Sequence, residues 1–158
     1  IECRIYAEDP YQQGVPSTGE IMGMYWPQGP GRRFDFGFEA GDVVSSFYDS
    51  MIAKVIVWDE SRIRAIQKMR STLKDTVIFG IKTNIPYLLA ILEQADFVNG
   101  DMTTQFVNQY FPQGLKHRPV LNVDVIEKIK VEVKASTSES NHINDRVSTN
   151  PWSQSVWS

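Results

Sequence analysis

The sequence predicts an α+β fold, in which an antiparallel β-sheet meander packs against two to three helices and a partly disordered C-terminal tail follows. Three observations predict it. Apolar and polar residues alternate in several runs within residues 1–58, and clusters of Gly and Pro separate these runs. Apolar residues recur every three to four positions after Asp59. Residues 135–149 are rich in Ser, Thr and Asn and offer few apolar side chains to bury.

The first predicted strand covers residues 1–8. Its apolar face comprises Ile1, Cys3, Ile5 and Ala7, and its polar face comprises Glu2, Arg4, Tyr6 and Glu8. Arg4 is a permanent cation on a rigid strand with carboxylates on the same face, which suits the binding of an anion or of a developing negative charge. The alternative interpretation is a row of exposed and weak ion pairs.

Three further strands are expected in the first sixty residues, each bounded by turn residues. They cover residues 20–26, 33–38 and 51–58, separated by turns at 11–19, 27–31 and 41–42. The run 51–58 is β-branched and apolar except for Lys54, so we expect a central strand. The stem of Lys54 is expected to pack while its ammonium group reaches solvent.

Helices are expected to dominate the sequence from residue 59 to residue 110. Asp59 is the expected N-cap of an amphipathic helix of about four turns. The residues expected at this spacing are Ile63, Ile66, Met69 or Arg70, and Leu73. Residues 77–80 predict a short buried strand between this helix and the next.

A second helix is expected to begin after Asn84 as its cap, with Pro86 in the first turn. Its buried side comprises Leu88, Leu89, Ile91 and Leu92. A third and shorter helix is expected from about Thr103 to Tyr110, preceded by several side-chain oxygens that can cap it.

The character of the sequence changes near residues 116–119, where we place a boundary. Residues 1–117 form the predicted domain, and residues 118–158 form a linker and the start of a following region. Residues 121–134 alternate like a possible strand, and residues 135–149 predict a mobile linker. Trp152 and Trp157 follow this polar stretch, so we expect them to dock on a partner.

Composition limits the function classes. With 158 residues, of which 42% are hydrophobic, the chain can form one domain with its own core. The formal net charge is −3 and the basic residues are scattered, which argues against nucleic acid as a partner. The single cysteine, Cys3, is expected in the core and cannot form an internal disulfide, which fits a reducing compartment. No membrane span or secretion signal is expected, and the start at Ile1 inside a strand indicates a segment of a longer polypeptide.

Several short motifs follow one another along the chain in an order that resembles a known protein family. They are Glu2-Cys3-Arg4-Ile5-Tyr6-Ala7-Glu8-Asp9-Pro10, Pro16-Ser17-Thr18-Gly19, Gly29-Pro30-Gly31-Arg32-Arg33, Tyr48-Asp49-Ser50-Met51-Ile52-Ala53-Lys54, Gly80-Ile81-Lys82-Thr83-Asn84, and Phe97-Val98-Asn99-Gly100 with Thr103-Thr104. Together they resemble the C-terminal domain of biotin carboxylase over about residues 1–115. Tyr6, Pro10-Tyr11 and residues 110–114 lean toward the propionyl- or methylcrotonyl-CoA carboxylase alpha type.

The resemblance implies a ligase of the ATP-grasp superfamily, in which ATP and bicarbonate carboxylate biotin carried on a separate domain. It implies that Arg4 stabilises the biotin enolate and helps to hold bicarbonate. It also implies that Asp49 aims the Arg4 guanidinium from a neighbouring strand. The alternative role of Asp49 is to cap the turn before the strand at 51–58.

Two weaker assignments follow from the same resemblance. Thr104, with Thr103, lies where the family's C-terminal domain approaches the adenine of ATP, although helix capping explains both threonines nearly as well. Arg33 lies in a region that helps to form the homodimer interface of bacterial members, and its alternative is an exposed strand arginine.

The resemblance also implies what this segment lacks. The residues that hold ATP and Mg²⁺ and the general base for biotin would precede Ile1, so we expect no metal site here and an inactive isolated fragment. The implied partners are an upstream ATP-grasp domain, a biotin carboxyl carrier domain and a carboxyltransferase subunit, with a homodimer possible and no nucleic acid or membrane. The location would be cytoplasmic, or the mitochondrial matrix in a eukaryote. The alternative function is a non-catalytic assembly module.

Overall fold

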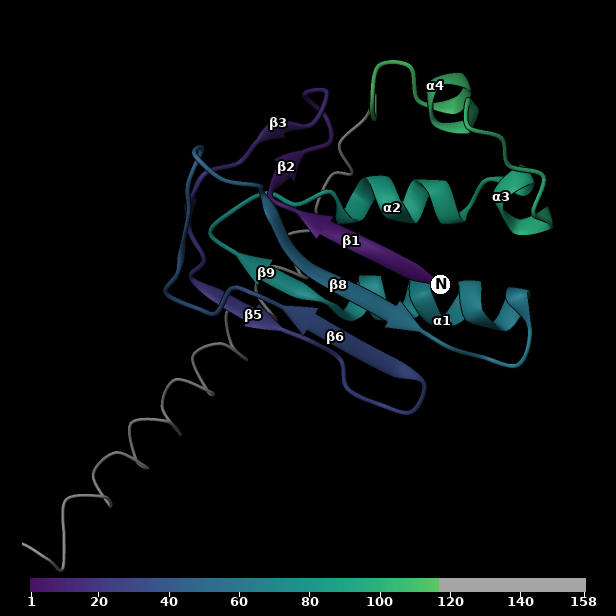
Figure 1. The fold of residues 1–158 in the computed structure, drawn as a ribbon, viewed down its shortest axis with the longest axis horizontal. Helices are drawn as coiled ribbons and strands as arrows, with labels where there is room; N and C mark the ends of the chain where they lie inside the picture. Colours follow the sequence, from purple (N-terminus) through teal and green to yellow (C-terminus); the bar gives the residue numbers. More distant parts are fainter. Residues whose placement is uncertain (117–158) are drawn as a thin grey trace, which may run out of the picture. The chain divides into compact units, whose positions relative to one another are not determined.

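The computed structural model describes residues 1–116 and confirms the predicted α+β class (Figure 1). The expectations for residues 118–158, including the strand at 121–134 and the docking of Trp152 and Trp157, lie outside the described residues. Within residues 1–116, no helix is both long enough and apolar enough to cross a membrane.

A three-stranded antiparallel sheet forms the centre of the fold. It consists of β1 (Glu2–Tyr6), β8 (Met51–Val57) and β6 (Arg32–Phe36), in the order β1-β8-β6. The predicted central position of the strand at 51–58 is therefore confirmed. In the register of the sheet, Arg4 lies opposite Lys54, and Lys54 lies opposite Asp35.

Short paired strands extend the molecule at one end of this sheet. They are β2 (Glu8–Asp9) with β3 (Val15–Pro16), β4 (Gly19–Glu20) with β7 (Val43–Val44), and β5 (Gly23–Tyr25) with β9 (Val77–Phe79), all antiparallel. The single strand predicted at 20–26 is thus divided into β4 and β5. Ile21, fully buried between them, anchors the division, because β4 and β5 pair with different strands.

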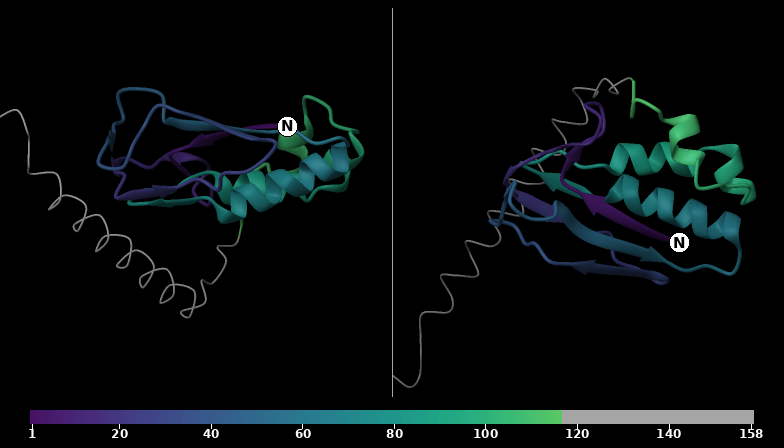
Figure 2. Two further views of the ribbon diagram at one scale, coloured as in Figure 1. Left: turned by 90° about the horizontal axis from the view of Figure 1, so that it is seen from below. Right: turned by 45° about the horizontal axis from the view of Figure 1, so that its top comes forward.

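Within residues 1–116, four helices follow the three-stranded sheet in the sequence, whereas two to three were expected. They are α1 (Arg62–Asp75), α2 (Ile85–Leu92), α3 (Ala95–Asn99) and α4 (Phe106–Tyr110). Figure 2 shows α1 and α2 on one side of the long strands. The helix α3 was not predicted, and α4 is shorter than the helix expected from Thr103.

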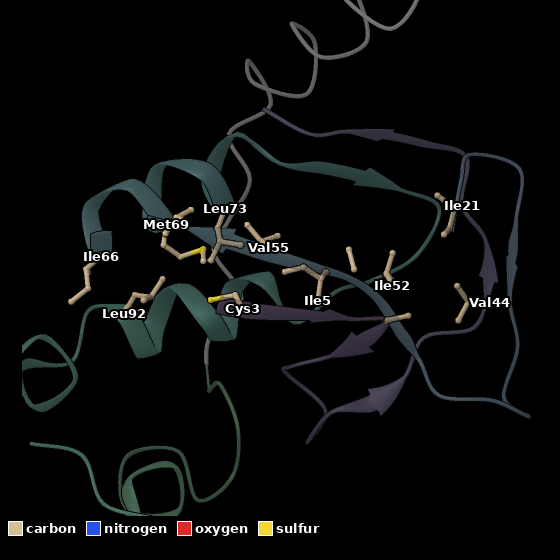
Figure 3. Close-up of a cluster of buried hydrophobic side chains, with 13 residues drawn as sticks. Cys3, Ile5, Ile21, Val44, Ile52, Val55, Ile66, Met69, Leu73 and Leu92 are labelled. Atoms are coloured by element: carbon tan, nitrogen blue, oxygen red, sulfur yellow. The ribbon is translucent and has the colours of Figure 1, made fainter. Parts of the chain in front are cut away.

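The core lies between the sheet and the helices (Figure 3). Cys3, Ile5 and Val55 contribute from the strands, and Met69 and Leu73 contribute from α1, all nearly inaccessible to solvent. The alternation predicted for residues 1–8 is confirmed by this burial. Since the apolar face of β1 points to the helices, its polar side chains lie on the opposite face of the sheet.

Ile63 does not belong to this core, although the sequence predicted that it would. Its exposed fraction is 59%, whereas Ile66 on the next turn is buried, with an exposed fraction of 3%. The apolar stripe of α1 therefore begins one turn later than the spacing suggested.

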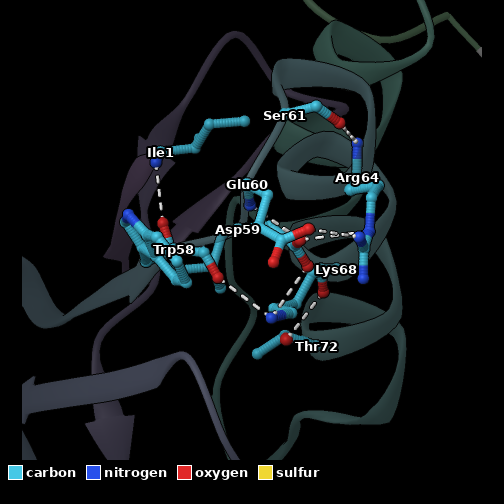
Figure 4. Close-up of polar contacts among 9 residues, drawn as sticks. Ile1, Trp58, Asp59, Glu60, Ser61, Arg64, Lys68 and Thr72 are labelled. Carbon is cyan, nitrogen blue, oxygen red and sulfur yellow. Dashed lines mark hydrogen bonds and ion pairs between the residues drawn. The ribbon is translucent and has the colours of Figure 1, made fainter.

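Ser61, not Asp59, is the N-cap of α1, so the prediction for Asp59 was wrong. The hydroxyl of Ser61 accepts a hydrogen bond from the amide of Arg64 at 3.3 Å. The Asp59 carboxylate is instead held by Arg64 at 3.1 Å and by Lys68 at 2.9 Å (Figure 4). The hydrogen bond from Lys68, followed by the one from the Glu60 amide, lowers the pKa of Asp59.

Candidate functional site

The candidate site is the face of the three-stranded sheet that α1 and α2 leave open. Ile1 and Val57 exchange both backbone hydrogen bonds, each at 2.9 Å. Bonded pairs alternate with pairs that share no backbone bond, so Arg4 and Lys54 form a close pair of the second kind. The open face therefore carries two cations side by side on adjacent strands.

The Arg4 side chain lies on the open face and is 59% exposed. Its Nε donates to Oε1 of Glu2 at 3.3 Å. The hydrogen bond to Glu2, followed by one to Tyr6, raises the pKa of Arg4 above its already high value. The guanidinium is therefore a permanent, partly oriented cation that solvent and ligands can reach.

Asp49 does not pair with Arg4. Its Oδ1 accepts a hydrogen bond from the amide of Met51 at 3.1 Å, which is the local capping role. Among residues 1–116 there is no ion pair between Arg4 and Asp49, and the carboxylate that contacts Arg4 is that of Glu2. Asp49 nevertheless defines the start of β8, the strand that is paired with β1.

Lys54 and Asp35 line a shallow depression of about 500 Å³ on the sheet. Lys54 is half-buried and, within the described part of the chain, forms no ion pair. Asp35 is engaged by Arg33, whose Nε and Nη2 donate to its two carboxylate oxygens at 2.8 and 2.9 Å. Arg33 is an exposed strand arginine, and its predicted role in a homodimer stays a prediction.

Thr104 lies away from this sheet, in the turn before α4, and is exposed. The hydroxyl of Thr103 accepts a hydrogen bond from the amide of Gln105, so the local capping expected there is present. Contact of Thr104 with adenine stays a prediction.

Asn84 has a position that the sequence did not predict. It is the residue before α2, as expected, but its side chain makes no capping bond to that helix. Its amide group instead reaches β1, accepting from the amide of Tyr6 at 2.9 Å and donating to the carbonyl of Arg4 at 3.1 Å. The sequence signal for this position was the occurrence of Asn84 in the motif Gly80–Asn84, whereas the preference of asparagine for helix N-caps predicted a side-chain bond to α2.

Cys3 is remote from this chemistry, because it faces the helices with an exposed fraction of 7%. Burial raises the pKa of its thiol to about 11. Cys3 is therefore a core residue, as expected, and is protonated at neutral pH. Residues 1–116 contain no group of three or more His, Cys, Asp or Glu side chains placed to hold a metal ion.

Comparison with known proteins identifies similar sequences. Residues 2–109 match the family model described as the biotin carboxylase C-terminal domain. The propionyl-CoA carboxylase alpha chain of mouse mitochondria (Mus musculus) is 39% identical over 118 residues, which cover 73% of this chain and 16% of that protein. Biotin carboxylase 1 of Bacillus subtilis is 44% identical over 114 residues, which cover 72% of this chain and 25% of that protein.

A solved structure shares the fold. It is the biotin carboxylase domain dimer of the Hydrogenobacter thermophilus 2-oxoglutarate carboxylase, in complex with MgADP, ADP and bicarbonate. The TM-score is 0.67 with 41% sequence identity, over 69% of this chain and 24% of that one. The chain therefore spans a quarter or less of the length of these relatives.

Proposed function

The chain belongs to the biotin carboxylase C-terminal domain family, and on this premise we propose that its open sheet face forms one wall of a biotin carboxylation site. Arg4 is the proposed catalytic residue. Its guanidinium holds bicarbonate and stabilises negative charge on the ureido oxygen of biotin. The observation that carries the proposal is the accessible, permanently charged Arg4 on a paired strand, oriented through Nε by Glu2.

The donor chemistry of Arg4 fits this role. A guanidinium offers N–H groups in one plane, which match the oxygens of bicarbonate and of a ureido group. Lys54 on the adjacent strand adds positive potential to the same face. A fixed donor of this kind contributes on the order of 10² to 10³ in rate, because it is already aimed where charge develops.

Biotin supplies the nitrogen that is carboxylated, and ATP supplies the activation of bicarbonate. We propose that biotin arrives on a separate carrier domain and that ATP and Mg²⁺ are held mainly by sequence outside this chain. The short share of each relative that the chain spans supports this division. Thr104 is the proposed contact of this chain with the edge of adenine.

Asp49 is proposed as a supporting residue rather than as a direct partner of Arg4. Its hydrogen bond to the Met51 amide fixes the first residue of β8. Because β8 pairs along the whole length of β1, the bond holds the strand on which the placement of Arg4 depends.

The proposed partners are the ATP-grasp domain, the carrier domain, a carboxyltransferase subunit and a second copy of the subunit. The proposed location is the cytoplasm, or the mitochondrial matrix in a eukaryote. We further propose that the isolated chain is inactive. We also propose that the isolated chain binds ATP and free biotin too weakly to measure, and saturable micromolar binding of ATP in calorimetry would contradict this.

A second candidate function is an assembly module without a catalytic residue. The observation that favours it is the exposure of Phe47 at 89% and Tyr48 at 85%, which is unusual for adjacent aromatic residues. This function predicts that loss of Arg4 leaves catalysis intact and that loss of the two aromatic residues weakens subunit association.

The deciding experiment replaces Arg4 by alanine in the complete carboxylase subunit and measures ATP-dependent carboxylation of free biotin. A fall in kcat on the order of 10² to 10³ is expected. Arg64→Ala is the matched control, because the Arg64 side chain is equally exposed at 60% and, within the described residues, its ion pairs are with Asp59 and Glu60 in the loop before α1. Unchanged activity of Arg4→Ala would remove the catalytic role.

A further inference from the structure

The edge of β1 that faces away from β8 is bound by Asn84. Odd-numbered residues of β1 bond to β8, so even-numbered residues point their backbone groups to the other edge. There the side chain of Asn84 bonds to the carbonyl of Arg4 and the amide of Tyr6, at 3.1 and 2.9 Å. The backbone amide of Asn84 also donates to the carbonyl of Tyr6 at 3.1 Å.

These three hydrogen bonds replace a neighbouring strand. Asn84 is 8% exposed, so little water is available to take over any bond that is lost. An amide side chain can accept with its oxygen and donate with its nitrogen at the same time, which the Arg4 carbonyl and Tyr6 amide require. Asparagine is therefore matched to this edge in both length and polarity.

The loop that carries Asn84 is itself fixed. The Lys82 amide donates to Oγ of Ser17 at 2.9 Å, and the Lys82 ammonium group contacts the buried carboxylate of Asp9 at 2.7 Å. Gly80 has φ of +99°, and a side chain there would clash with the carbonyl of Glu20. The loop thus fixes the position of Asn84 beside the edge of β1.

We propose that Asn84 is the positioning residue for Arg4. It fixes the backbone at the Arg4 carbonyl and two residues further on, while β8 fixes the opposite edge of the strand. The guanidinium is then aimed from a backbone held on both sides. The inference rests on the proposed function of Arg4, and Asn84 itself contacts no reactant.

Two variants separate this role from general stability. Asn84→Asp keeps the size and can accept from the Tyr6 amide, but its carboxylate cannot donate to the Arg4 carbonyl. Thr76→Val is the matched control, because Thr76 is also 8% exposed and donates to a backbone carbonyl, that of Thr72, at 2.8 Å. Thr76 is the C-cap of α1, and both its amide and its hydroxyl donate to the carbonyl of Thr72 rather than to β1.

The experiment measures ATP-dependent carboxylation of free biotin by the complete subunit, with single variants and the double variant Arg4→Ala/Asn84→Asp. Asn84→Asp is expected to lower kcat by roughly 10- to 100-fold, because a displacement near 1 Å can cost that much. KM for ATP is expected to stay constant. Thr76→Val is expected to lower Tm and leave kcat within about twofold.

The double variant provides the decisive comparison. If Asn84 acts through Arg4, the double variant is no slower than Arg4→Ala alone. If Asn84→Asp lowers kcat by the same factor in the Arg4→Ala background as in the wild-type background, the inference is overturned while the role of Arg4 stands. A fully active Arg4→Ala enzyme would overturn both. If Asn84→Asp does not fold, Asn84→Ser, which keeps a hydroxyl near β1, enters the same cycle.

Discussion

Arg4 on β1 lies directly opposite Lys54 on β8, in a close pair that shares no backbone hydrogen bond. Like charges opposite each other on a sheet repel, yet neither Glu2 nor Asp35 forms an ion pair with Lys54 within residues 1–116. Glu2 contacts Arg4 and Asp35 contacts Arg33. The arrangement raises the positive potential at the open face, which favours an anion there.

Replacement of Lys54 by methionine is expected to raise KM for bicarbonate about two- to fivefold, because it removes one of the two cations that lie opposite each other on the open face. The effect should shrink as salt is added, since exposed charges are screened over about 10 Å at 0.1 M. Steady-state kinetics at two ionic strengths measures it. Lys74→Met at the exposed end of α1 is the control, and an equal KM in both variants at low salt would contradict the prediction.

Replacement of Arg4 by lysine is expected to retain the charge but recover only a minor part of the activity. The ammonium group lacks the planar pair of donors and cannot keep the Nε contact with Glu2 while reaching a ligand. We expect a loss of kcat on the order of 10-fold or more in carboxylation of free biotin. A lysine variant as active as wild type would show that charge alone is sufficient.

The Cys3 thiol is expected to make the free energy of unfolding depend on pH in the alkaline range. Its folded pKa of about 11 is raised above 9.0, so the protonated thiol favours the folded state and its contribution is complete below pH 9. It is lost as pH rises from 9 to 11, at about 1.4 kcal/mol per pH unit. Urea denaturation across this range measures it. The Cys3→Ala protein should lack this portion of the slope, and identical slopes would be inconsistent with the assignment.

The start of α1 depends on Ser61 rather than on Asp59. Ser61→Ala should lower the free energy of unfolding by about 0.5–2 kcal/mol, the usual effect of a lost N-cap.

Asp59→Asn should instead lower the free energy of unfolding by an amount that depends on pH. The folded pKa of Asp59 is lowered, so its contribution is present above its ordinary value of 3.8 and is lost as pH falls further. Denaturation at pH 7 and pH 3 distinguishes the two, since only the Asp59 effect should fade at the lower pH.

Local patterns were sufficient for the elements that bury one regular face. Alternation in β1, the apolar run of β8 and the spacing in α1 predicted the strands, the central position of β8 and the length of the helix. These features follow from the periods of strand and helix alone. The open face and its Arg4 could be inferred for the same reason.

Features decided by distant contacts were missed. The strand expected at 20–26 divides because β4 and β5 pair with different strands. The pairing partners of a strand cannot be predicted from the local sequence pattern. Asn84 uses its amide on β1, nearly eighty residues earlier in the chain, instead of on α2. The helix α3 had one local signal, since Gly100 with φ of +89° ends it in a left-handed cap.

The bonds of Asn84 also have a consequence for self-association. Unpaired strand edges are templates on which other chains add strands and aggregate. Asn84 occupies the β1 edge at Arg4 and Tyr6 with two side-chain bonds and one backbone bond, and an incoming strand would have to break all three. Within the described residues, β6 is therefore the edge from which the central sheet could grow, and there the paired charges of Arg33 and Asp35 discourage unspecific strand addition.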